Sequence, residues 1–125
     1  MALYHKLARA YIGINEFQEA LANFQQLLKI SKEIGSRAEE ATAYRGISMS
    51  YSCIGKHIQV IFYQRKLLEI AKETGDKQKE RGAYVIIARA YSALGKKDKF
   101  IECENEALRI CREIGDKRGE AKNAW

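Results

Sequence analysis

Apolar residues recur along the chain at the spacing of one face of a helix. In the first stretch, Tyr4, Leu7, Ala8 and Tyr11 follow the i, i+3, i+4, i+7 rule of an amphipathic helix. After a break at residues 13–15, a second stripe at helical spacing contains Phe17, Ala20, Leu21, Phe24, Leu27 and Leu28. Both stripes recur twice further along the chain, so the pattern predicts an all-α protein built from pairs of amphipathic helices.

The helix pairs repeat with a spacing of 40 residues, which keeps the dipeptides Ala10-Tyr11, Ser50-Tyr51 and Ala90-Tyr91 in register. A fixed repeat with helical periodicity is typical of units that stack and bury their apolar faces only against their neighbours. We therefore predict one domain over the whole chain, residues 1–125. Its predicted repeats are residues 1–36, 37–76 and 77–116, followed by a partial next helix at 117–125.

Glycine marks the predicted helix ends, because a left-handed residue there satisfies free carbonyls without a Cβ penalty. The first helices of units two and three end at Gly55 and Gly95, and the second helices end at Gly35, Gly75 and Gly115. Each of the last three is followed by a helix-capping residue, namely Ser36, Asp76 and Asp116. The chain therefore reverses between units with almost no loop.

The residues of the first unit resemble the signature positions of the tetratricopeptide repeat family. These positions are Tyr4, Leu7, Ala8, Tyr11, Phe17, Ala20, Leu21, Phe24 and Leu27. The resemblance implies a right-handed α-solenoid of three helix hairpins plus the start of a seventh helix. The 40-residue unit is similar to that of the Pins/LGN group of adaptor arrays. The resemblance also implies a non-enzymatic scaffold for protein partners. Because the repeat stops partway through the next first helix, we expect a fragment of a longer array.

Composition and charge narrow the range of partners and cellular locations that we expect for the protein. The chain has 46% hydrophobic and 30% charged residues, and 22 Lys and Arg against 16 Asp and Glu give a net charge of +6. Such a balance favours acidic partners. No run approaches the length of a membrane helix, and the N-terminus has no hydrophobic signal core, so we expect a cytoplasmic protein without membrane contact.

The residues that could carry chemistry are few and scattered. His5 and His57 lie in different units, and neither is spaced to pair with a nucleophile. Cys53, Cys103 and Cys111 have no metal or redox spacing, which favours reduced structural thiols. We therefore expect no catalytic residues, no metal site and no cofactor.

The repeat register and the resemblance together suggest a ligand-binding concave wall formed by the first helices of the units. The candidate peptide-binding residues are His5, Lys6, Arg9, Ile12, Arg45, Gly46, Met49, Val85, Ile86 and Arg89. This surface is basic with an apolar middle and carries no carboxylate. It predicts an acidic or amphipathic peptide as ligand, with arginine contacting its carboxylates. The alternative is that these arginines pair with glutamates of neighbouring helices.

The sequence alone leaves open why two glycines lie inside predicted helices, and it leaves open two functions other than peptide binding. Gly46 and Gly82 lie inside predicted helices, where close approach of a ligand backbone would explain them. For Gly82, sequence drift near the helix start is the alternative explanation. Nucleic-acid binding is the alternative that the basic charge suggests, although aromatic platforms are lacking. A structural assembly segment is the other, because the last unit leaves Phe100, Ile101 and Leu108 on an uncapped edge suited to self-association.

Overall fold

The computed structural model describes residues 17–123 of the chain, with side chains up to residue 115. This part is helical throughout and contains no strand, which confirms the all-α prediction for it. The helices are α2 (Phe17–Ile34), α3 (Arg37–Cys53), α4 (His57–Thr74), α5 (Lys77–Ala93) and α6 (Lys97–Asn123). The predicted first helix of the first unit lies outside the described residues.

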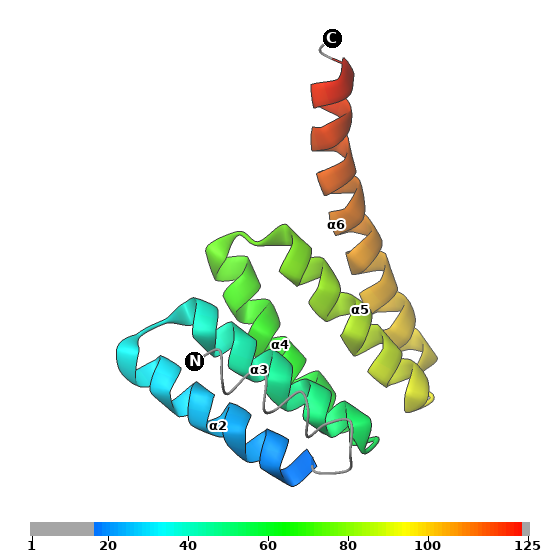
Figure 1. Cartoon of the computed structure of the whole chain (residues 1–125). Coiled ribbons are helices and arrows are strands. Elements are labelled where there is room, and N and C mark those ends of the chain that lie inside the picture. Colours follow the sequence, from blue (N-terminus) through cyan, green and yellow to red (C-terminus); the bar gives the residue numbers. More distant parts are fainter. Residues whose placement is uncertain (1–16, 124–125) are drawn as a thin grey trace.

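Successive helices run in opposite directions and stack in chain order (Figure 1). Within the described part, α2 packs on α3, α3 on α4, α4 on α5 and α5 on α6, and the backbones of helices further apart in the sequence do not approach each other as closely. This arrangement is that of a solenoid, in which each element is stabilised by its immediate neighbours. None of the described helices is long and apolar enough to cross a membrane.

The turns between units follow the predicted glycine and capping chemistry. Gly35 and Gly75 adopt φ values of 71° and 69°, the left-handed conformation that ends a helix. The Ser36 hydroxyl oxygen accepts a hydrogen bond from the backbone N–H of Glu39 at 3.3 Å, and an Asp76 carboxylate oxygen accepts from that of Lys79 at 3.1 Å. These caps set the points at which α3 and α5 begin.

The largest cluster of buried apolar residues joins α4, α5 and α6. Its members include Val60, Ile61, Leu68, Ala83, Ile87, Ala88 and Cys103. A second cluster joins α2 to α3 through Phe24, Leu27 and Ile47. Burial of these side chains is the main force that holds successive helices together.

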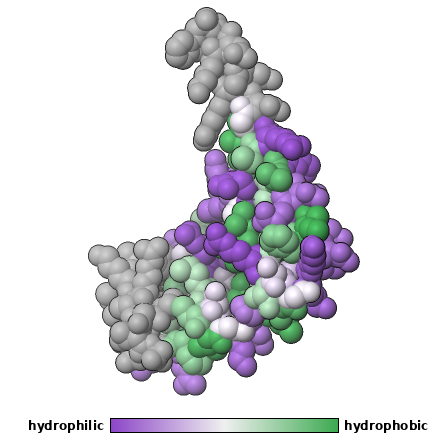
Figure 2. All heavy atoms as spheres, turned by 90° about the vertical axis from the view of Figure 1, so that its right-hand side faces the viewer, coloured by the Kyte–Doolittle hydropathy of each residue, from purple (hydrophilic) through white to green (hydrophobic). Residues whose placement is uncertain are grey.

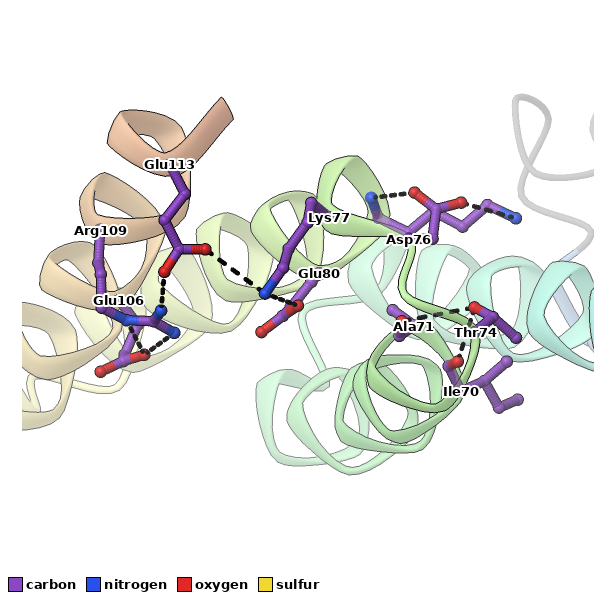
Figure 3. A network of polar contacts seen from close by, with 10 residues as sticks. Ile70, Ala71, Thr74, Asp76, Lys77, Glu80, Glu106, Arg109 and Glu113 are labelled. Carbon is purple, nitrogen blue, oxygen red and sulfur yellow. Dashed lines mark hydrogen bonds and ion pairs between the residues drawn. The ribbon is translucent and has the colours of Figure 1, made fainter. Parts of the chain in front are cut away.

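An ion-pair clasp repeats at the same end of α3 and α5. Arg37 contacts Glu40 one turn later and Glu73 at the end of α4. Forty residues on, Lys77 contacts Glu80 at 3.5 Å and Glu113 of α6 at 3.4 Å (Figure 3). Glu40 and Glu80 are buried, whereas Glu73 and Glu113 are partly exposed. The exposed pairs between helices each contribute only about 0–1 kcal/mol, so they orient the helices more than they stabilise the fold.

The helix α6 differs from the prediction of a helix end at Gly115 and a new helix after it. It continues without interruption to Asn123, and its distal part extends beyond the other helices (Figure 1). Glycine permits a helix end but does not require one. At Gly35 and Gly75 the reversal brings the next helix against the preceding one, whereas the residues after Asp116 carry few apolar side chains to stabilise such a contact.

One stripe of α6 therefore retains exposed apolar residues. Ile101 and Leu108 are 44% and 51% exposed, whereas Ile61 and Leu68, 40 residues earlier on α4, are buried against α5. On the side seen in Figure 2, hydrophobic groups form separate patches among hydrophilic ones. Phe100, predicted to lie on this exposed edge, is half-buried against the core. Self-association through Ile101 and Leu108 stays a prediction.

Two glycines inside helices give a matched test of the packing. A Cβ at Gly46 would lie 2.2 Å from the Phe24 ring, whereas a Cβ at Gly82 would meet nothing within 4 Å. We expect Gly46→Ala to lower the free energy of unfolding by about 1–3 kcal/mol through overpacking. Gly82→Ala is expected to raise it by up to about 1 kcal/mol through helix propensity. Urea denaturation measures both, and effects of the same sign would contradict this packing.

Candidate functional site

Two adjacent hollows lie between α3 and α5, over α4. The first has a volume of about 360 Å³, and its lining includes Thr42, Arg45, Gln64, Leu67, Lys79, Arg81, Gly82 and Ile86. The second has a volume of about 270 Å³, and its lining includes Ser48, Met49, Ser52, His57, Gln64, Ile86 and Arg89. Gln64 and Ile86 line both hollows, so the two meet at these residues. We call the combined surface the α3–α5 groove.

The groove lies at the second of two interfaces between units, where the residue pair differs from the pair at the first interface. Where α2 meets α3, the Phe24 ring packs directly over Gly46. Forty residues on, the same register positions hold Gln64 and Ile86. Gln64 has no aromatic ring to fill this interface, and the hollows are found there. Tyr63 does not replace the ring, because it stacks on Tyr51 of α3 with centroids 5.8 Å apart.

The rim of the groove is positively charged. Arg45, Lys79, Arg81 and Arg89 line it, and none of the described residues in its lining is an aspartate or glutamate. Lys79 lies 3.9 Å from Asp76, and Arg81 donates to the Gln78 side chain at 3.4 Å. Arg45 and Arg89 are exposed and have no ion pair within the described part of the chain. Arg45 and Arg89 therefore present positive charge in the groove that no acidic side chain of the described residues neutralises.

The structure brings together part of the predicted concave wall. Of the residues predicted from sequence, Arg45, Met49, Ile86 and Arg89 line the groove. Val85 is half-buried and lines neither hollow. The predicted residues His5, Lys6, Arg9 and Ile12 lie outside the described residues.

The assignment of Gly46 to the ligand-binding wall is wrong. Gly46 is buried, and the Phe24 ring covers the place where its side chain would be. The glycine therefore allows α2 and α3 to pack closely. Gly82, by contrast, lines the first hollow with open space beside it.

Sequence reasoning missed Gln64 and Leu67 on the floor of the groove and Lys79 and Arg81 on its rim. The available signal for Gln64 was its polar side chain at a register position that holds Phe24 one unit earlier. Lys79 and Arg81 follow the N-terminal cap of α5. Helical periodicity there does not show which side chains face the groove and which face solvent.

The described residues hold no group of three or more His, Cys, Asp or Glu placed to bind a metal ion. His57 lines the second hollow. Cys103 is buried and burial raises the pKa of its thiol, whereas Cys53 and Cys111 are exposed. Burial likewise raises the pKa of Tyr63.

Comparisons with known proteins identify the family. The sequence matches the tetratricopeptide repeat family over residues 1–73 and again over residues 82–114. The fold is similar to the crystal structure of the TPR domain of Arabidopsis FLU, with a TM-score of 0.80, 23% sequence identity, and coverage of 90% of this chain and 94% of that one. No curated protein matched the sequence significantly.

The chain therefore belongs to the tetratricopeptide repeat family. Domains of this family generally mediate protein–protein interaction and are typically non-enzymatic scaffolds. The family defines the class of function.

Proposed function

We propose that the protein is an interaction scaffold whose α3–α5 groove binds an acidic peptide segment of a partner protein. The observation that supports this most strongly is the positive charge of Arg45 and Arg89, which no described acidic residue neutralises. Guanidinium groups bind carboxylates through paired hydrogen bonds. The apolar side chains of Met49, Leu67 and Ile86 offer contacts between the charged ones.

The alternative ligand class, nucleic acid, has less support. Binding of single strands relies on exposed aromatic side chains that stack on bases. Here Tyr44, Tyr51 and Tyr63 pack against one another, and the Tyr91 hydroxyl accepts a hydrogen bond from Arg65. We therefore treat oligonucleotide binding as an outcome that the experiment below detects.

We further propose that the chain is one segment of a longer right-handed array of 40-residue units of the Pins/LGN type that works in the cytoplasm. Capping residues and ion-pair clasps spaced 40 residues apart support the regular stacking of units. The exposed Ile101 and Leu108 on α6 are suited to contact a further helix or a second copy of the chain.

Charge reversal in the groove tests the peptide proposal. A nonapeptide selected on the whole chain from a random displayed library serves as the probe, and we expect it to be rich in Asp and Glu. Combining Arg45→Glu with Arg89→Glu should weaken its binding by at least about tenfold, because two attractive contacts become repulsive. Circular dichroism should not change, since both side chains are exposed.

The matched control combines Lys97→Glu with Lys99→Glu at the exposed start of α6, which changes net charge equally outside the groove. This control should lower peptide affinity less than threefold at about 0.15 M salt, where distant charges are screened. Two results would refute the proposal: selection of neutral or basic peptides, or equal losses in both double variants. Submicromolar binding of a random single-stranded oligonucleotide, unaffected by the groove reversal, would favour nucleic acid instead.

A further inference from the structure

Gln64 is a polar residue buried where the groove meets the core. Its side chain is fully buried, yet the residue lines both hollows. It extends from α4, the second helix of its unit, whereas the predicted ligand-binding wall consisted of first-helix residues only. A buried side-chain amide has two donor hydrogens and one acceptor oxygen to satisfy.

A short hydrogen-bond chain fixes the orientation of this amide. The Ser48 hydroxyl donates to the backbone carbonyl of Arg45 at 2.9 Å. The Ser48 oxygen is thereby left as an acceptor, and Gln64 Nε2 donates to it at 2.7 Å. Gln64 Oε1 is then the free end of the amide. It is shielded from solvent, and no group in the described part of the chain donates a hydrogen bond to it.

At the equivalent position one unit earlier, the chain has an apolar residue. Phe24 fills the interface between α2 and α3 without any polar atom. An unsatisfied buried acceptor costs free energy that an apolar side chain would not. Stability alone therefore does not explain glutamine at position 64, whereas a ligand that supplies a donor does.

We infer that Gln64 Oε1 accepts a hydrogen bond from a backbone N–H of an extended peptide that crosses both hollows, with acidic side chains of the peptide at Arg45 and Arg89. Gln64 already lines both hollows, so a peptide seated in them lies against its side chain. An extended strand leaves its backbone N–H groups free to bond, whereas those of a helix beyond its first turn are already bonded within the helix. The inference rests on the proposed function and adds a residue that selects the ligand's conformation.

Backbone esters test this inference, because an ester replaces one peptide N–H by oxygen. The selected nonapeptide is synthesised with an ester at each position in turn and titrated into the wild-type chain and into Gln64→Met. Methionine keeps the length of the side chain and removes its acceptor. We expect one ester position to weaken wild-type binding about tenfold and to weaken binding to Gln64→Met less than twofold.

A spectroscopic readout covers the case in which Gln64→Met does not fold. In the wild-type chain, the side-chain carbonyl 13C resonance of Gln64 should shift with the amide peptide and not with the critical ester peptide. Ester effects that are the same in wild type and Gln64→Met, or a Gln64 resonance that responds equally to both peptides, would overturn the inference. Loss of binding on Arg45 and Arg89 reversal would still uphold the proposed function, so the two failures are distinguishable.

Discussion

Replacement of Ile87 by alanine is expected to lower the free energy of unfolding by about 2–5 kcal/mol, the range for large-to-small changes in a close-packed core. Ile87 is fully buried in the cluster that joins α4, α5 and α6. In a solenoid each unit is stabilised only by its neighbours, so a cavity at one interface weakens the coupling between units directly. Urea denaturation followed by circular dichroism measures the loss.

Ile58→Ala is the matched control for this change. Ile58 is also an isoleucine in a helix but is 68% exposed, so its truncation should alter stability by less than about 0.5 kcal/mol. Losses of similar size at both positions would mean that the faces of α4 and α5 are wrongly assigned. A loss below about 0.5 kcal/mol at Ile87 would contradict the packing described above.

The elements that could be predicted from sequence are those fixed by local chemistry. Helical periodicity depends only on the spacing of apolar residues, and the caps at Ser36 and Asp76 depend on residues within one turn. The left-handed glycines at the unit boundaries follow from the same local rules. Those features were therefore predictable without knowledge of the neighbouring helices.

The features that were mispredicted depend on contacts between helices. Gly115 has the same sequence surroundings as Gly35 and Gly75, yet α6 continues through it, because a helix end also needs a neighbour for the next helix. Gly46 appeared to be open to a ligand, but Phe24 from the preceding helix covers it. Distances along the sequence do not reveal which side chain crosses an interface.

The groove itself was predictable only in part. Register along the first helices identified Arg45, Met49, Ile86 and Arg89 as groove residues. The floor could not be derived in that way, because Gln64 and Leu67 belong to α4 and reach the groove between α3 and α5. The sequence shows that Gln64 is polar at a register position that is apolar one unit earlier, but only the structure shows that it lies beneath both hollows.

A double variant that closes the groove should weaken peptide binding by at least about thirtyfold while preserving the fold. Gln64→Phe combined with Ile86→Gly transfers the Phe24–Gly46 pair of the first interface into the second, where the ring should occupy the junction of the hollows. The fold should be retained, at a cost of about 1 kcal/mol for a glycine inside α5. Ile86→Gly alone is the control, because it carries the same helix penalty and leaves the groove open.

Calorimetric titration of the selected nonapeptide into this double variant tests most directly whether the α3–α5 groove is the binding site. We expect wild-type helicity, affinity reduced by at least about thirtyfold, and a much smaller reduction for Ile86→Gly alone, since binding requires the concave space that the ring occupies. A folded double variant that binds the nonapeptide with wild-type affinity would contradict this expectation.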